Sequence, residues 1–156
     1  MLTIDIPGRG VLEVRQVVCD YNGTIAADGR LVDDAAERVR RLAEFAQVSV
    51  LTADTFGTVR AQCEGLPVNV RVFDRDDASA CKASIVCELG AAGCVCIGNG
   101  FNDIAMFGEA ALSIAVIGGE GACAKLLICA DVVVTSPLDA FDLLLNPNRL
   151  RATLRG

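Results

Sequence analysis

Apolar residues in this chain fall into short runs, and these runs alternate with segments in which apolar positions recur every three or four residues. The short runs predict buried strands, and the helical spacing predicts amphipathic helices between them. Strands are predicted at residues 16–20, 47–52, 68–73, 93–97, 112–116 and 131–135, and helices at about 33–45, before 65, at 78–89, 102–109, from 121 and at 136–145. Strict alternation of this kind predicts an α/β fold: a doubly wound, Rossmann-like, mostly parallel sheet with helices on both faces.

The two ends of the chain differ from this core. Residues 2–6 and 11–14 alternate apolar and polar positions around Pro7-Gly8-Arg9-Gly10, which predicts a β-hairpin at a sheet edge or as a flap. Residues 148–156 carry Leu150 and Leu154 at helical spacing, so they form either a docked helix or a frayed tail. We therefore expect one domain over 1–156, with a hairpin at 1–15, a core at 16–147 and this last segment at 148–156.

Composition narrows the classes of function. The net charge of −6 and the pI of about 4.6 argue against a nucleic-acid or anionic-membrane partner. Hydrophobic residues make up 53% of the chain, yet no apolar run approaches the ~20 residues of a spanning helix. Because the N-terminus also lacks a basic region and a long apolar segment, we expect a cytoplasmic protein.

Histidine is absent, which excludes Ser-His and Cys-His catalysis and any zinc site that contains histidine. There are eight cysteines but no Cys-x-x-Cys pair. Cys94 and Cys96 fall on one face of a predicted strand, where we expect them to be small buried hydrophobes. The ligands that remain for a metal are mainly oxygens, which favour Mg²⁺ over zinc.

The chemistry centres on residues 17–24, where the apolar run Val17-Val18-Cys19 ends in Asp20 and a polar turn, Asn22-Gly23-Thr24, follows. A buried strand that ends in an acid presents that acid at the carboxyl edge of the sheet, where open α/β folds bind ligands. Asp20 is therefore a candidate nucleophile, metal ligand, or both.

Three further stretches share this position in the predicted topology. Thr52 ends a strand, Lys82 lies in the first turns of a helix that follows a strand, and Asn99 and Asp103 lie in a glycine turn after another strand. Simpler structural interpretations exist for each: Thr52 as a helix cap in competition with Asp54 or Thr55, Lys82 as an exposed lysine, and 99–103 as an ordinary capped turn.

Taken together, these motifs resemble the haloacid dehalogenase (HAD) superfamily. Its four motifs match residues 17–24, Leu51-Thr52, Lys82 and residues 97–103, and the run 98–106 resembles the hinge motif of P-type ATPases and of phosphoserine phosphatases. Over its whole length the chain is similar to the small soluble P-type ATPase group, which consists of stand-alone domains without membrane helices. ATP pumping is excluded, because we find neither a membrane segment nor a nucleotide-domain insertion.

The resemblance implies a role for each residue. Asp20 would attack phosphorus to give an aspartyl-phosphate, and Lys82 would neutralise charge. The phosphate would be bound by Thr52, Lys82 and the backbone of Gly23 and Ala53. Mg²⁺ would be held by Asp20, the Asn22 backbone carbonyl, Asn99 and Asp103. The cation and the lysine together would offset the repulsion between a carboxylate and a phosphate dianion.

Two positions depart from the family pattern. The phosphatases usually carry Asp, the general acid and base, where this chain has Asn22, and Asp where it has Asn99. An amide cannot exchange the proton, and it brings no charge to a hard cation. We therefore expect either a slow phosphatase or phosphotransferase with a long-lived phosphoenzyme, or a regulatory domain that binds Mg²⁺ and phosphate.

Residues 25–32 and 57–81 are too short to hold the cap domain that the superfamily inserts at these points. An open site suits a phosphorylated macromolecule, or a phosphorylated small molecule under a lid that a second copy of the chain provides. A homo-oligomer is therefore a further expectation.

Overall fold

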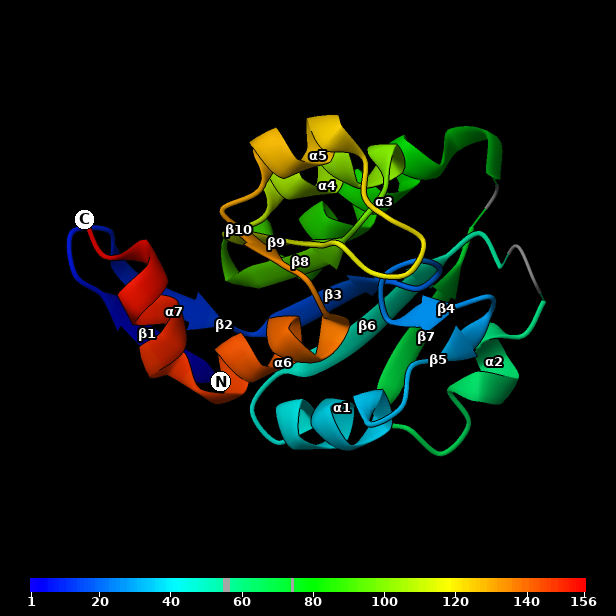
Figure 1. The fold of residues 1–156 in the computed structure, drawn as a ribbon, viewed down its shortest axis with the longest axis horizontal. Coiled ribbons are helices and arrows are strands. Elements are labelled where there is room, and N and C mark those ends of the chain that lie inside the picture. The colour runs from blue at the N-terminus through cyan, green and yellow to red at the C-terminus, as the bar shows by residue number, and fades with distance from the viewer. Residues whose placement is uncertain (55–56, 74) are drawn as a thin grey trace.

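The computed structural model describes residues 1–54, 57–73 and 75–156. Its centre is a six-stranded, fully parallel sheet in the order β10-β9-β8-β3-β6-β7 (Figure 1). The strands are β3 (Gln16–Asp20), β6 (Gln47–Thr52), β7 (Val68–Val72), β8 (Cys94–Gly98), β9 (Leu112–Val116) and β10 (Val132–Val134). From β3 the chain runs outward through β6 and β7, and then returns to the other side of β3 as β8. The order therefore reverses beside β3, and this is the position at which doubly wound sheets bind ligands.

Helices cover both faces of the sheet, as predicted (Figure 1). α1 (Ala35–Ala43) and α6 (Pro137–Leu145) pack on one face, while α3 (Ala78–Leu89), α4 (Ile104–Glu109) and α5 (Ala124–Cys129) pack on the other. Alternate residues of each strand serve the two cores, because successive side chains point to opposite faces. Cys94 and Cys96 both join the core beneath α3–α5, which confirms that they share one face, and all eight cysteines are free thiols.

The N-terminal hairpin is confirmed as a separate two-stranded sheet of β1 (Leu2–Ile6) and β2 (Gly10–Val14). Of the two alternatives for the C-terminal segment, the structure shows the docked helix: α7 (Pro147–Leu154) packs on β1 and buries Leu150 completely. Arg151 Nε donates to the Asp5 carbonyl at 2.9 Å, which ties this helix to the hairpin.

Two helices begin after an aspartate that does not cap them through its side chain. α1 begins after Asp34, whose backbone is left-handed (φ 65°) and whose side chain makes no capping hydrogen bond. Asp77 precedes α3, also without a side-chain cap. In contrast, Ser136 caps α6 as its Ser-Pro sequence predicts, because its hydroxyl accepts a hydrogen bond from the Leu138 N–H.

The segment after Asp20 contains further short elements. It forms a short hairpin of β4 (Ala26–Ala27) and β5 (Arg30–Leu31), and the helix after β6 is only one turn long, α2 (Val59–Gln62). Short 3₁₀ turns at Arg75–Asp77, Ala91–Gly93 and Phe101–Asp103 precede α3, β8 and α4. Within the described residues, neither 25–32 nor 57–81 contains a cap domain.

Among the described residues, we find no helix with the length and apolar character needed to cross a membrane.

Candidate active site

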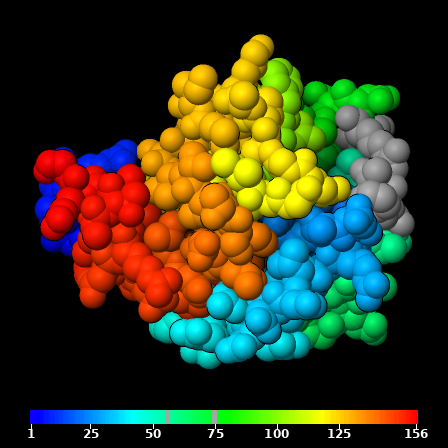
Figure 2. Space-filling model, in the orientation of Figure 1, coloured from blue at the N-terminus to red at the C-terminus, as the bar shows by residue number. Residues whose placement is uncertain are grey.

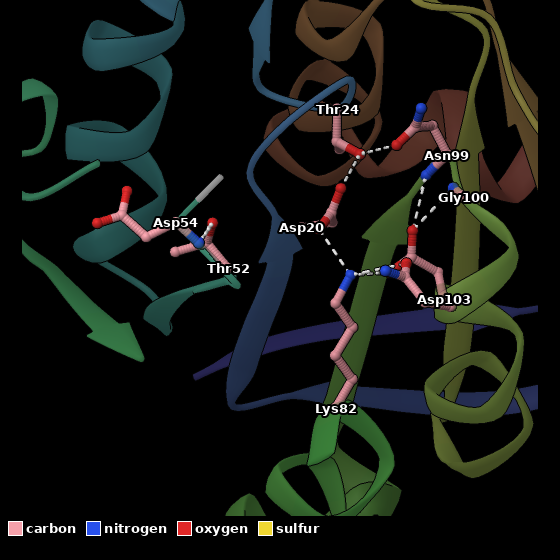
Figure 3. Close-up of polar contacts among 9 residues, drawn as sticks. Asp20, Thr24, Thr52, Asp54, Lys82, Asn99, Gly100 and Asp103 are labelled. Atoms are coloured by element: carbon pink, nitrogen blue, oxygen red, sulfur yellow. Dashed lines mark hydrogen bonds and ion pairs between the residues drawn. The ribbon is translucent and has the colours of Figure 1, made fainter. Parts of the chain in front are cut away.

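Asp20 lies at the carboxyl end of β3, between β6 and β8, and is 8% exposed. Lys82 reaches it from α3: the distance from Lys82 Nζ to Asp20 Oδ1 is 2.6 Å (Figure 3). The same ammonium group is 2.6 Å from Asp103 Oδ1 and 3.1 Å from Asn102 Oδ1. Lys82 is only 1% exposed, so it is a buried cation shared by two carboxylates rather than an exposed helix lysine.

Asp103 is fully buried, and both of its carboxylate oxygens are engaged. Oδ1 takes the Lys82 ion pair, while Oδ2 accepts hydrogen bonds from the backbone N–H groups of Asn99 and Gly100 at 3.0 and 2.9 Å. Gly98 makes this possible, because a β-carbon there would lie 2.5 Å from the Asp103 carboxylate. Asp103 therefore orients Lys82 and closes the turn after β8. The metal role that the sequence predicts for it stays a prediction, and only Oδ1, which accepts one hydrogen bond, keeps a lone pair for a cation. We call Lys82, Asn102 and Asp103 the lysine side of the site.

The pKa values of Asp20 and Lys82 are set by burial and by neighbouring charges. Burial raises the pKa of Asp20 to about 7 and the charge of Asp103 adds to this, while Lys82 and Thr24 act in the opposite direction. For Lys82, burial alone would lower the pKa, but Asp20 and Asp103 outweigh it, and the net pKa is raised. Lys82 is therefore a permanent cation near neutral pH, whereas Asp20 is poised to gain or lose a proton.

The opposite side of Asp20 contains amides and a hydroxyl. Thr24 Oγ1 lies 3.1 Å from Asp20 Oδ2 and 3.0 Å from Asn99 Oδ1 (Figure 3). One hydroxyl carries one proton, so it can donate to only one of these two oxygens at a time. Asn22 Oδ1 is also buried, and it has no hydrogen-bond partner. We call Asn22, Thr24 and Asn99 the amide side of the site.

An excess of oxygen acceptors over protons is the donor set that a hard cation such as Mg²⁺ fits. The described residues contain no group of three or more His, Cys, Asp or Glu side chains arranged to hold a metal ion. A cation here would therefore depend on Asp20 together with amide and backbone oxygens. The residues fit Mg²⁺ in kind, but they offer it little charge.

Thr52 and Ala53 line the same pocket from the end of β6. The Thr52 hydroxyl accepts a hydrogen bond from the Asp54 N–H at 2.8 Å, and Asp54 Oδ1 accepts one from Val59 N–H at the start of α2. Asp54 thus partners the first N–H of that helix, which separates its role from that of Thr52. Thr55, the other competing cap, lies outside the described residues.

The backbone N–H of Gly23 is engaged within the turn, although the sequence predicts that Gly23 binds phosphate. Its N–H donates to the Ala26 carbonyl at 2.8 Å within the turn, so it is not free for a phosphate. Its φ of +78° favours glycine, and a β-carbon there would lie 2.5 Å from Asn99 Nδ2 and 2.9 Å from Glu120 Oε2. Gly23 therefore allows two other residues to approach the turn.

The pocket has a volume of about 390 Å³. Its lining comprises Asp20, Asn22, Thr52, Ala53, Phe73, Lys82, Asn99, Gly100, Asn102 and Glu120. The structure thus brings together residues of all four predicted motifs, and it adds Glu120, which sequence reasoning missed. The available signal was weak: Glu120 is an acid in a glycine-rich loop directly after the predicted strand at 112–116.

Comparison with known sequences identifies relatives without an assigned activity, and no family model matches the chain. Two uncharacterized proteins of Methanocaldococcus jannaschii are similar to parts of it. MJ0073 is 52% identical over 61 residues, which is 39% of this chain and 66% of that protein, slightly under two thirds. MJ0072 is 44% identical over 39 residues, which is 25% of this chain and 89% of that protein.

Comparison with solved structures gives the fold. A cobalt-bound deoxy-D-mannose-octulosonate 8-phosphate phosphatase from Haemophilus influenzae has a TM-score of 0.71 at 15% identity, over 92% of this chain and 94% of that one. A 3-deoxy-D-manno-octulosonate 8-phosphate phosphatase from Moraxella catarrhalis, in complex with a magnesium ion, a phosphate ion and a KDO molecule, has a TM-score of 0.68 at 17% identity, over 91% of this chain and 94% of that one. A Legionella pneumophila protein described as a HAD superfamily hydrolase of subfamily III A has a TM-score of 0.71 at 17% identity, over 90% and 87%. The chain therefore has the HAD fold.

Proposed function

We propose that this chain is a Mg²⁺-dependent phosphohydrolase or phosphotransferase that acts through an aspartyl-phosphate on Asp20. The HAD fold supports this proposal. By sequence the chain belongs to the same family as the uncharacterized protein MJ0072. The observation that carries this proposal is the Asp20 carboxylate, which lines an open pocket at a strand end and is held at 2.6 Å by a buried lysine.

The chain's own residues divide the work. Asp20 attacks the phosphorus atom, and the P–O bond to the leaving group breaks as the aspartyl P–O bond forms. Lys82 holds the Asp20 carboxylate in one orientation and offsets its charge, so that a phosphate dianion can approach. Thr52, with Ala53 beside it, faces the phosphoryl oxygens from β6. Water then attacks the aspartyl-phosphate and releases inorganic phosphate.

Mg²⁺, when bound, would neutralise phosphate charge and favour the dissociated form of Asp20. Asp20, the backbone carbonyl of Asn22 and Asn99 would hold it, on the amide side. Two of the solved neighbours contain a divalent metal, cobalt in one and magnesium in the other, which supports a cation at this end of the fold.

Turnover should be slow because Asn22 cannot donate a proton to the leaving group or accept one from water. General acid–base catalysis typically contributes about 10²–10⁴-fold, which corresponds to roughly 3–5 kcal/mol in the barrier. The phosphoenzyme is then expected to persist, since its hydrolysis lacks a base. A phosphorylated small molecule is the favoured substrate, because the Moraxella catarrhalis neighbour was solved with phosphate and a sugar acid.

A second candidate function is a regulatory domain that binds Mg²⁺ and phosphate without turnover. The observation in its favour is the pair of amides, Asn22 and Asn99, at positions where the superfamily's phosphatases carry acids. Cytoplasmic location and a homo-oligomer remain predictions beside either function.

The test is hydrolysis of a small aryl phosphate with and without Mg²⁺, by the native protein and by Asp20→Asn, with phosphate release and protein mass followed together. We expect slow Mg²⁺-dependent release and a one-phosphate mass increase, both lost in the variant. A stable adduct without release would indicate a phosphoenzyme switch. Neither release nor adduct, in a folded sample, would favour the binding domain instead.

A further inference from the structure

The loop between β9 and α5, residues 117–123, is attached directly to the candidate site. The Asn99 side-chain amide donates to the Gly121 carbonyl at 3.1 Å, and the Cys123 N–H donates to the Asn99 carbonyl at 2.8 Å. A hydrogen bond from Gly121 N to Gly118 O at 3.0 Å closes the loop into a turn. On the surface, this yellow loop lies against the lighter blue segment that follows β3 and contains β4 and β5 (Figure 2). The loop is therefore held in a fixed position beside the amide side.

At its tip the loop carries Glu120, whose carboxylate lies over the turn that follows Asp20. The Glu120 oxygen Oε2 and the Asn99 amide both approach the point that a β-carbon on Gly23 would occupy, at 2.9 and 2.5 Å. A β-carbon on Gly118 would lie 3.6 Å from the Gly23 carbonyl oxygen, so the two turns pack closely with glycine on both sides. Glu120 is exposed at the pocket lining, and among the described residues it has no hydrogen bond or ion pair.

The carboxylates of the site can be accounted for one by one. Asp20 shares its charge with Lys82, and both oxygens of Asp103 are engaged by Lys82 and by backbone N–H groups. Asn22 and Asn99 are neutral. Of the described residues that line the pocket, Asp20 and Glu120 alone carry a carboxyl group, and Glu120 is the one without a partner.

We infer that Glu120 is the second carboxylate that holds the divalent cation of this site, directly or through water on the cation, and so replaces the acid that position 99 lacks. This inference rests on the proposed function. Mg²⁺ sites use one or two carboxylates and keep several waters, so a carboxylate that reaches in from a neighbouring loop suits them. Without a cation, a glutamate at the mouth of this pocket would repel a phosphate dianion; with one, its charge strengthens the site.

The experiment measures Mn²⁺ binding by titration calorimetry on the folded, metal-free protein, without any substrate. Glu120→Gln is expected to weaken Mn²⁺ affinity by roughly 10-fold or more, the typical loss for a residue that supports a metal centre. Glu44→Gln is the matched control. Glu44 is exposed and lines a separate groove together with Gln16 and Gln47, the first residues of β3 and β6, so its loss should not change the affinity.

A rescue variant separates a charge effect from loop damage. Asn99→Asp in the Glu120→Gln background returns one carboxylate to the amide side, and it should restore most of the lost affinity. Unchanged Mn²⁺ affinity in Glu120→Gln, with Asp20→Asn still weakened, would overturn the inference and leave the proposed function standing. Absence of Mn²⁺ binding by the native protein would overturn both the inference and the metal dependence of the proposed function.

Discussion

The two sides of Asp20 differ in how completely their polar groups are satisfied. On the lysine side, one buried ammonium meets two carboxylates at 2.6 Å, and backbone N–H groups occupy the remaining Asp103 oxygen. On the amide side, one hydroxyl proton serves two oxygens, and Asn22 Oδ1 has no partner. Buried polar groups normally find partners, so an unsatisfied cluster beside a complete one indicates where a ligand belongs. The lysine side therefore fixes the positions of Asp20 and Lys82 and supplies a positive charge, whereas the amide side keeps oxygen atoms that a cation could bind.

The largest effect is expected from removal of the lysine. Lys82→Met leaves Asp20 and Asp103 buried together without a cation, which should cost about 3–5 kcal/mol in the free energy of unfolding and abolish phosphate release. Urea unfolding and the aryl phosphate assay measure the two effects. Lys125→Met is the matched control, because the chain's other lysine lies 5.9 Å from the centre of the exposed Phe101 ring, outside the pocket. A Lys82→Met protein as stable as the control would show that the lysine side does not depend on its ion pairs.

The next effect concerns catalysis on the amide side. Asn22→Asp supplies a carboxyl group that can exchange a proton, and it should raise steady-state phosphate release by about 10²-fold or more. The phosphoenzyme adduct should fall in the same variant, which mass spectrometry during turnover would detect. Asn102→Asp makes the same chemical change on the lysine side, where we expect no acceleration. Equal rates in the two variants would contradict the assignment of proton transfer to position 22.

The contrast between the two sides also explains how far the sequence could predict the site. Asp20, Lys82 and Asn99 were identified because each follows a buried strand or opens the next helix, and a parallel sheet brings such positions to one edge. The parallel sheet and both layers of helices followed from the same alternation, whereas the order of the strands came from the structure. These features depend on local patterns, which a single sequence displays.

What the sequence could not predict depends on contacts between distant segments. Asp103 was expected at the metal, and the sequence did not show that its carboxylate also holds Lys82 and the backbone of the turn after β8. Gly23 was expected to offer its N–H to a phosphate, but Ala26 takes it in a hairpin whose two-residue strands are too short to give a pattern. Glu120 was missed because its position follows from how β8 and β9 lie beside β3, a strand that comes much earlier in the sequence.

Asp20, which lies between the two sides, is expected to make the stability of the folded protein depend on pH. Burial, with the charge of Asp103, raises the pKa of this carboxyl from its ordinary 3.8 to about 7 in the folded protein. Between about pH 7 and pH 4 the folded state therefore binds more protons at this position than the unfolded state does. Its contribution to stability must then rise as the pH falls through that window. Lys82 stays protonated throughout this pH range, so it does not contribute to the change of stability with pH.

The check is urea unfolding of the native protein and of Asp20→Asn across pH 4 to 8 in metal-free buffer, since a bound cation would favour the ionised carboxylate. The native protein should gain stability relative to the variant as the pH falls from about 7. The difference between the two proteins removes the contribution of the other carboxyl groups. A gap that stays constant would mean that Asp20 titrates in its ordinary range, and a gap that changes in the opposite direction would mean that its pKa is lowered in the folded protein; either result contradicts the prediction.

The smallest expected effect tests how tightly the amide side is packed. Gly10 and Gly23 both have positive φ angles, +93° and +78°, but a β-carbon meets nothing within 4 Å at Gly10 and meets Asn99 and Glu120 at Gly23. Gly10→Ala should therefore cost only the backbone strain of about 1 kcal/mol, and Gly23→Ala should cost roughly 1 kcal/mol more. Urea unfolding gives this difference, and Mn²⁺ titration should show weaker binding in Gly23→Ala alone. If both variants lost the same stability and kept the same Mn²⁺ affinity, Asn99 and Glu120 would have room to move, and the amide side would be a flexible surface rather than a built site.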